Sequence, residues 1–415
     1  MRIGLFVDGS FLPSREGATQ HIYLLTKYLP NIGVDVVLFH CYRGWSDISL
    51  IQRESFTTYL LTPDQYYHNP LLISEIVQSE GINILQMCDP TLILSVGLPV
   101  KKAKQVKLIW EIHEVVSSLL KQLGVTNIQQ HIDLEINASK CCDRIICFTE
   151  NDREQLIDIG ILSKRIVIVP CGVDITSVPY FGSCKDSLTT LFLGNMFYEP
   201  NYRAAKLIIE DIQPSVCSTI ENAVFKMVGT TPNDLISYQN ENLIFTGPLD
   251  PWADVFRDVR IAIAPVQACT GMRIKLLDYM AAGLPIVSSS SAAVGINHGE
   301  SILIEDSIPT FAQKIISLLL DPLNCERLGI QCRRRVELYH DWLKIVPNFS
   351  IVYDQIASND WSDLESSDVG HIPNGVLTPP LWLEETLSKR RFTSINTTSI
   401  KFPAVIRDHA EPKSI

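Results

Sequence analysis

Four residues in the second half of the chain have the types and spacing of a phosphate-binding site. Gly271 follows a short apolar run, and Arg273, Lys275 and Asp278 come next in a stretch with helical periodicity. The free amides at the start of such a helix and the two cations would converge on phosphate charge. Asp278 lies further into the helix, where its carboxylate would accept hydrogen bonds from ribose hydroxyls. The competing interpretation is a surface amphipathic helix with a solvated basic edge.

A histidine stands at the end of a predicted strand in the first half. His113 closes the sequence Trp-Glu-Ile-His at 110–113, between Glu111 and Glu114. Open α/β sheets bind ligands beyond the carboxyl ends of their strands, so His113 is placed to hydrogen-bond a sugar hydroxyl or to assist a leaving phosphate. An ion-paired or capping histidine between two glutamates fits the same residues, and the sequence leaves both interpretations open.

A glycine lies in the turn after the first predicted strand. Gly17 stands where a loop gives way to a helical pattern, so the backbone there can approach an anion such as a diphosphate closely. An ordinary loop glycine is the competing interpretation. The surrounding residues do not form G-x-G-x-x-G, which counts against a dinucleotide-dependent oxidoreductase.

Short apolar runs alternate with longer amphipathic stretches, a pattern typical of buried parallel strands joined by helices. The sequence therefore predicts an α/β protein with two Rossmann-like sheets. Helices fit between the strands, for example at 21–29 and 151–159. The predicted strands are 3–7, 34–40, 82–87, 107–112, 144–148 and 166–169 in the first half, and 191–193, 224–228, 243–245, 261–264, 286–288 and 301–304 in the second.

The stretch from Gly172 to about residue 189 is polar and weakly patterned, as an interdomain linker would be. We therefore expect an N-terminal domain at 1–180 and a C-terminal domain at 181–338. A helix at 339–357 and a polar tail at 358–415, to which we assign no chemistry, complete the chain.

Composition excludes several classes of protein. The net charge of −11 argues against a nucleic-acid binder, and 46% hydrophobic with 20% charged residues is the balance of a folded protein. The N-terminus lacks a signal-peptide core, and the longest apolar stretch, 91–100, is shorter than the ~18 residues of a membrane helix. The 11 cysteines include no C-x-x-C, so we expect reduced thiols and a cytoplasmic protein. Peripheral contact with the inner membrane face, through the lysines at 101–107 or the apolar side chains at 59–72, stays open.

The order of these motifs resembles the GT-B glycosyltransferases of family 4 over about residues 1 to 357. The segment 270–287 is the most specific part of the resemblance, and 194–201 is similar to the branch that modifies cell-surface saccharides. The motifs that carry the resemblance are the Gly17 loop, His113, Phe148-Thr149-Glu150, Pro170 to Asp174, Phe192-Leu193-Gly194 and Thr270 to Val287.

The resemblance implies two Rossmann-like domains that face a cleft, with the helix at 339–357 crossing back to the N-terminal domain. The donor would be a nucleotide-diphosphate sugar held mainly by the second domain, and the acceptor a saccharide or lipid-linked group held by the first. A hexose-type sugar would be transferred with retention, as in polysaccharide biosynthesis. The implied donor-binding residues are Gly17, Gly194, Gly271, Arg273, Lys275 and Asp278, and the implied catalytic residues are His113, Arg273 and Lys275.

No metal and no other cofactor is implied, and the sequence has no Asp-x-Asp to hold a metal-bridged diphosphate. Thr270 and Asp278 stand where the family commonly has two glutamates, and Asn195 stands where it often has an Arg-Lys pair. The hypothesis is that Arg273, Lys275 and Arg203 compensate for the missing pair. A catalytically silent nucleotide-sugar-binding subunit that supports a partner enzyme is therefore the alternative. A sugar-nucleotide epimerase would need an acid and base pair that the sequence does not offer beyond His113 and the two glutamates beside it. The oligomeric state stays open.

Overall fold

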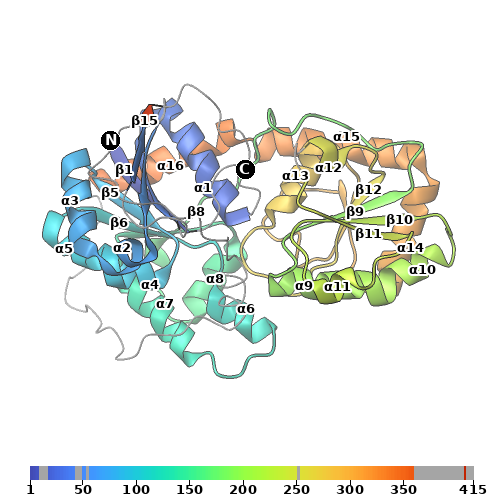
Figure 1. Cartoon of the computed structure of the whole chain (residues 1–415), viewed down its shortest axis with the longest axis horizontal. Helices are drawn as coiled ribbons and strands as arrows, with labels where there is room; N and C mark the ends of the chain where they lie inside the picture. Colours follow the sequence, from blue (N-terminus) through green and yellow to red (C-terminus); the bar gives the residue numbers. More distant parts are fainter. Residues whose placement is uncertain (9–16, 43–48, 53–55, 250–252, 359–405, 408–415) are drawn as a thin grey trace, which may run out of the picture.

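The computed structural model describes residues 1–8, 17–42, 49–52, 56–249, 253–358 and 406–407. Two β-sheets lie side by side within these residues, and helices cover both faces of each sheet (Figure 1). Apart from one short edge strand, the first sheet is built from the chain before residue 169 and the second from the chain after residue 188. This is the α/β architecture with two sheets that the sequence predicts.

Seven parallel strands form the main part of the first sheet, in the order β4-β2-β1-β5-β6-β7-β8. β3 pairs antiparallel with β4, and β15 pairs with β3 at the edge. The central strands read as apolar runs because both faces are covered; residues 3–7 of β1 are all buried. The strands are β1 (Arg2–Asp8), β2 (Asp35–Cys41), β3 (Ser49–Gln52), β4 (Phe56–Leu61), β5 (Ile84–Met87), β6 (Lys107–Glu111), β7 (Arg144–Cys147), β8 (Ile166–Ile168) and β15 (Ile406–Arg407).

The second sheet has six strands, all parallel, in the order β11-β10-β9-β12-β13-β14. Its central strand β12 is fully buried, so small and β-branched residues alternate there without any polar side chain. The strands are β9 (Thr189–Leu193), β10 (Val224–Val228), β11 (Leu243–Gly247), β12 (Ile261–Ala264), β13 (Ile286–Ser288) and β14 (Ile302–Ile304).

Helices connect the successive parallel strands, because such strands cannot be joined by a hairpin. The first part of the chain forms α1 (Gly17–Tyr28), α2 (Pro63–His68), α3 (Pro70–Glu80), α4 (Pro90–Leu92), α5 (Leu98–Lys104), α6 (Val116–Gln122), α7 (Gln129–Cys141) and α8 (Glu150–Asp158). The second part forms α9 (Glu199–Leu207), α10 (Gln213–Cys217), α11 (Asn233–Ile236), α12 (Ala253–Phe256), α13 (Ile274–Ala282), α14 (Ile308–Leu320), α15 (Pro322–Tyr339) and α16 (Trp342–Ala357).

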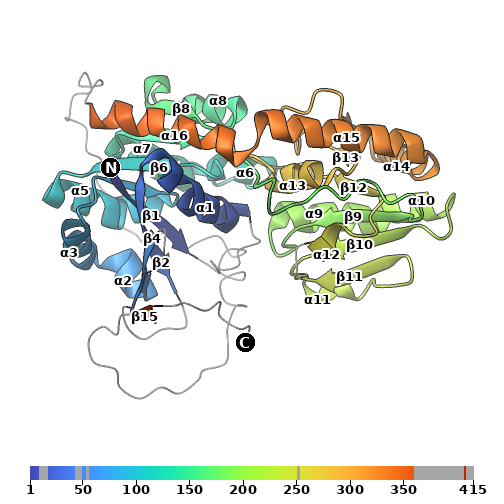
Figure 2. The same cartoon turned by 90° about the horizontal axis from the view of Figure 1, so that it is seen from above.

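The last two of the described helices bridge the two halves of the molecule. Figure 2 shows α15 along the second sheet and α16 continuing from it over the first. Asp341 caps the start of α16, and its carboxylate accepts a hydrogen bond from the Leu343 amide. Its buried face joins the core around α1, with Trp342, Phe349 and Tyr353 each 0% exposed. The C-terminal helix is thus part of the first sheet's core.

Every strand predicted from the sequence is present within about two residues. β3 and β4 were not predicted, because β4 has Thr57 and Thr58 within it and the run looks only weakly apolar. The helix predicted at 339–357 is wrong at its start, since Tyr339 ends α15 and His340 and Asp341 separate the two helices. In the predicted tail, residues 359–405 and 408–415 lie outside the described residues.

Two surface features bear on the question of membrane contact. Lys101, in the basic run, ion-pairs with Asp143 at 2.8 Å, and the apolar stretch 59–72 packs largely into the core of the first sheet, although Leu71 is 78% exposed. Among the described helices, none combines the length and the apolar character needed to span a bilayer.

Candidate active site

The loop between β12 and α13 meets the first sheet at Gly271. This residue has φ +68°, and a Cβ there would collide with the carbonyl oxygen of His113. Its amide donates a 2.7 Å hydrogen bond to Asp152 Oδ1, which lies at the start of α8. Only glycine fits both the left-handed backbone and this close approach. Gly271 therefore joins the end of the second sheet directly to the end of the first.

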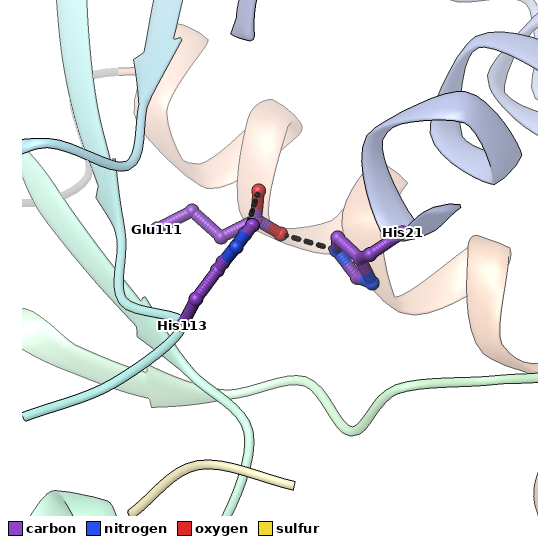
Figure 3. Close-up of side chains that lie close together, drawn as sticks. All are labelled: His21, Glu111 and His113. Atoms are coloured by element: carbon purple, nitrogen blue, oxygen red, sulfur yellow. Dashed lines mark hydrogen bonds and ion pairs between the residues drawn. The ribbon is translucent and has the colours of Figure 1, made fainter. Parts of the chain in front are cut away.

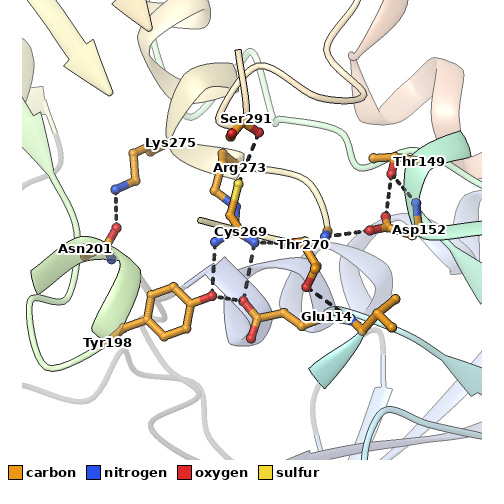
Figure 4. A network of polar contacts seen from close by, with 12 residues as sticks. Glu114, Thr149, Asp152, Tyr198, Asn201, Cys269, Thr270, Arg273, Lys275 and Ser291 are labelled. Atoms are coloured by element: carbon orange, nitrogen blue, oxygen red, sulfur yellow. Dashed lines mark hydrogen bonds and ion pairs between the residues drawn. The ribbon is translucent and has the colours of Figure 1, made fainter. Parts of the chain in front are cut away.

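Arg273 contacts residues from both halves of the chain (Figure 4). Its guanidinium lies 3.3 Å from Glu114 Oε1 and 3.4 Å from the Tyr198 hydroxyl, and it also bonds the carbonyl of Thr270. The Tyr198 hydroxyl in turn donates to Glu114. Burial opposes the charge on Arg273, but Tyr198 and Glu114 outweigh burial and raise its pKa. Arg273 is a fixed cation at this interface.

Lys275 is a half-buried cation with one hydrogen bond. Its Nζ donates to Asn201 Oδ1 at 2.7 Å and lies 4.4 Å from the centre of the Phe192 ring. The described residues place no carboxylate within ion-pair distance of Nζ. Burial, with the nearby charge of Arg273, lowers the pKa of Lys275 to about 7. A Cβ on Gly194 would lie 3.0 Å from this Nζ, so the glycine leaves room for the lysine.

Asp278 lies one turn further along α13 and is 2% exposed. Its Oδ1 atom has no hydrogen-bond partner among the described residues. Burial raises the pKa of Asp278 to about 8, although a contact with Gln20 of α1 lowers it in part. An unpartnered buried oxygen is costly, so this carboxyl group is suited to accept a hydrogen bond from a bound hydroxyl.

A second polar group lies at the end of the first sheet, and Figure 3 shows its three members pointing toward one another. The carboxylate of Glu111 contacts His21 Nε2 at 2.8 Å through one oxygen and His113 Nε2 at 3.6 Å through the other. Burial opposes protonation of His113, but Cys88 and Glu111 outweigh it and raise the pKa of His113 to about 10. Burial lowers the pKa of His21. His113 is therefore the charged partner of Glu111.

These three side chains also have the spacing of a cation site, with ligand atoms all within 4.8 Å of one another. Gln86 Nε2, however, donates to Glu111 Oε2 at 3.0 Å, so both carboxylate oxygens already accept hydrogen bonds from the protein. We therefore assign the group to hydrogen bonding rather than to metal binding.

The structure brings most of the predicted site residues together. One end of the second sheet holds Gly194, Gly271, Arg273 and Lys275. The backbone carbonyl of His113 lies against Gly271. Gly17 begins α1, and a Cβ placed on it would lie 3.8 Å from Ile274. Sequence reasoning missed the residues that bind these side chains, of which Gln20, Glu114 and Asp152 come from the other half of the chain. Each of them follows the carboxyl end of a strand or lies on α1, and that position is the signal that could have found them; they are Gln20, His21, Glu114, Asp152, Tyr198 and Asn201.

A cavity of about 290 Å³ borders the interface and is lined by residues of both halves, including Gln122, Arg203 and Gln267. Arg203 bonds Glu199 at 2.7 Å and the Leu123 carbonyl at 3.3 Å. Its contribution to diphosphate binding, in place of the Arg-Lys pair expected after Gly194, stays a prediction.

Two sequence families match the chain. "Glycosyltransferase Family 4" matches residues 15–177, and "Glycosyl transferases group 1" matches residues 187–321, so that together they span most of the chain. The chain belongs to the family 4, or group 1, glycosyltransferases. The GT-B fold follows from solved structures that share it.

Among these structures, sucrose-phosphate synthase from Thermosynechococcus elongatus superposes on this glycosyltransferase with a TM-score of 0.70 and 14% identity, over 86% of this chain and 99% of that one. Anabaena Alr3699/HepE in complex with UDP-glucose gives a TM-score of 0.68 and 10% identity, over 86% and 100%. At these identities the similarity concerns the fold.

Two relatives match by sequence. The Escherichia coli UDP-Gal:alpha-D-GlcNAc-diphosphoundecaprenol alpha-1,3-galactosyltransferase is 24% identical over an alignment of 254 residues, which covers 54% of this glycosyltransferase and 64% of that protein. An uncharacterized 44.6 kDa protein in the cps region of Klebsiella pneumoniae is 29% identical over 139 residues, 31% and 36% of the two chains. The match thus spans less than two thirds of the length of either relative.

Proposed function

We propose that this chain is a retaining glycosyltransferase that moves a hexose-type sugar from a nucleotide-diphosphate sugar to a saccharide, lipid or other glycoconjugate acceptor. The observation that carries the proposal is Lys275, a half-buried lysine beside Arg273 that has an amide oxygen but no carboxylate for a partner in the described residues. A buried cation without an anion is costly, and a diphosphate would supply the missing charge.

The roles of the residues follow from the charge that develops during transfer. When the bond between the sugar and the diphosphate breaks, negative charge grows on the leaving phosphate, and preorganised cations stabilise that charge most. Arg273 and Lys275 would supply this stabilisation, together with the backbone at Gly194 and Gly271 and a backbone amide of Gly17. No metal is needed in this scheme.

The remaining contacts concern the two sugars of the donor. Asp278, with its unpartnered Oδ1, would hold the ribose hydroxyls. His113, whose carbonyl oxygen lies against Gly271, would contact the transferring sugar from the end of the first sheet. The retaining outcome is proposed from the family resemblance.

The donor and acceptor to test first come from the relatives' names. One relative is named for transfer from UDP-galactose to a diphosphoundecaprenol-linked sugar, and a structural neighbour was solved with UDP-glucose. We therefore propose uridine diphosphate sugars as donors and lipid-linked saccharides as acceptors. An acceptor of this kind fits a cytoplasmic protein with peripheral contact at the inner face of the membrane.

A thermal-shift screen against nucleoside diphosphates and nucleotide sugars tests the donor site. A ligand that binds the folded state raises the melting temperature with concentration. We expect one nucleotide class to stabilise the wild type and Lys226→Met equally, but not Lys275→Ala. Lys226 is a suitable control because it is also partly buried, with a lowered pKa caused by burial, but bonds carbonyls near α12. Stabilisation of all three proteins alike would remove the site assignment.

A catalytically silent nucleotide-sugar-binding subunit is the second candidate. Thr270 stands where the family commonly has a glutamate, and its hydroxyl accepts a hydrogen bond from the Val115 amide at 3.1 Å, so it is already used in the interface. This candidate predicts that the nucleotide binds but that no transfer occurs. Product formation from a radiolabelled donor with any acceptor in a lipid-linked panel would exclude it.

A further inference from the structure

Glu111 is fully buried and receives polar groups from two other parts of the chain and from the nearby His113. His21 of α1 contacts one carboxylate oxygen at 2.8 Å, while Gln86 of β5 donates to the other at 3.0 Å. His113 lies 3.6 Å from that second oxygen. The mechanism proposed above uses only His113 of these residues, and it does not explain why the carboxylate is held by so many partners.

The hydrogen bonds continue from Glu111 to the last helix. The Tyr353 hydroxyl of α16 donates to Gln86 Oε1 at 2.8 Å, and Tyr353 is 0% exposed. Because the Gln86 amide accepts from Tyr353 through its oxygen, its nitrogen must face Glu111. Three buried side chains are therefore linked in one direction, from Tyr353 through Gln86 to Glu111.

His113 is held on several sides. Its Nε2 faces Glu111 and lies 3.2 Å from Cys88 Sγ. The centre of its ring lies 5.3 Å from the centre of the Phe148 ring and 5.4 Å from that of the His21 ring, which is nearly perpendicular to it. The other ring nitrogen, Nδ1, makes no hydrogen bond to the described residues, so it is the nitrogen left for a ligand.

We propose that Tyr353, Gln86 and Glu111 are positioning residues that fix the ring of His113, with Nε2 toward Glu111 and Nδ1–H toward the transferring sugar. α16 thereby supports the active site through a hydrogen bond as well as through its apolar face. The inference rests on the proposed function, in which His113 meets the sugar. It adds three residues that touch neither donor nor acceptor.

The groups that set the protonation of His113 come from each element packed against it. They are Glu111 of β6, Cys88 after β5 and His21 of α1, and the contacts of Cys88 and Glu111 favour the charged ring against the effect of burial. If Tyr353 no longer holds Gln86, the amide can turn its oxygen toward Glu111. The two groups would then repel, and Glu111 would move relative to His113.

The test is Tyr353→Phe in the full chain, which removes one hydroxyl and keeps the packing of the ring. We expect kcat to fall about tenfold and the donor KM to change less than about twofold, because the diphosphate is held by the other sheet. In the free protein we expect the His113 ring signals, followed by NMR against pH, to titrate at a lower pH than in the wild type.

Tyr59→Phe is the matched control. The Tyr59 hydroxyl also donates to a side-chain oxygen, that of Glu80, at 2.6 Å, but on β4, away from β6 in the same sheet. It should lose comparable stability and leave both kcat and the titration of His113 unchanged. Glu111→Gln is the second variant, and it should lower the pKa of His113 further than Tyr353→Phe does.

A wild-type titration of His113 in both Tyr353→Phe and Glu111→Gln would overturn the positioning role, whatever the activity. A shifted titration with unchanged kcat would also overturn it, because the ring would then be held without consequence for transfer. Neither result touches the assignment of Arg273 and Lys275, so the proposed function would stand or fall separately.

Discussion

The two polar groups that meet at Gly271 differ in how complete they are. On the first sheet, both oxygens of Glu111 have donors and the charge of His113 is balanced by that carboxylate. On the second sheet, Lys275 has no carboxylate in the described residues and Asp278 Oδ1 has no partner. The protein thus balances the charges of the first group, although His21 Nδ1 and His113 Nδ1 have no hydrogen bond in the described residues, whereas the second group lacks an anion and a hydroxyl. We infer that a ligand supplies them.

Loss of the second sheet's fixed cation should have the largest effect. Arg273→Ala is expected to lower kcat/KM by about 10²- to 10³-fold, because a preorganised donor to the leaving group is lost. The control is Arg333→Ala on α15, whose guanidinium instead bonds backbone carbonyls of Val178 and Ala281. Steady-state kinetics with both variants check the prediction. A larger kinetic defect in Arg333→Ala would mean that Arg273 acts through stability alone.

A substitution that moves the two polar groups apart should have the second-largest effect on activity. Gly271→Ala is expected to lower kcat/KM by about 10²-fold, since a Cβ would push the loop away from His113 by roughly an ångström or more. Gly33→Ala has nearly the same left-handed backbone, φ +76°, with no atom near the added Cβ. It should cost only about 1 kcal/mol of stability and no activity. Equal kinetics of the two variants would contradict the close contact.

The sequence predicted the parts of this arrangement that depend on near neighbours. Apolar runs identified β12 and β13, and the order of Gly271, Arg273 and Lys275 identified the cation pair. Glu114 and Asp152 could not be paired with that loop, because 159 and 119 residues separate the partners and periodicity reports only on neighbouring turns. The Tyr353 to Gln86 bond, 267 residues apart, was out of reach for the same reason.

Lys275, which has no carboxylate partner in the described residues, should make nucleotide binding depend on pH. The pKa of Lys275 is lowered to about 7, and a bound diphosphate would raise it, so binding takes up a proton above pH 7. Affinity for a fully ionised diphosphate should then weaken by up to about tenfold per pH unit between pH 7 and 9. Calorimetry in buffers of different ionisation heats measures the uptake. Lys275→Arg should abolish it, and uptake that persists in that variant would assign the proton elsewhere.

The smallest effect concerns Asp278. Its pKa is raised to about 8, so the group is a neutral acid at pH 7, and Asp278→Asn should change nucleotide affinity there by less than about threefold. Because the folded state holds this proton between the ordinary value of 3.8 and about 8, the wild type should lose stability as pH rises through that window. Asp278→Asn should lose this dependence. Denaturant melts at several pH values measure it, and identical slopes would contradict the buried neutral acid.

The most direct test is the dissociation constant of uridine diphosphate for three proteins at pH 7. Wild type and Lys226→Met are predicted to bind equally, and Lys275→Ala to bind about 10- to 100-fold more weakly, because a charge-assisted hydrogen bond is lost. Calorimetric titration gives all three values under one set of conditions. Equal binding by Lys275→Ala and the wild type would contradict the claim that the second sheet lacks an anion that the donor supplies.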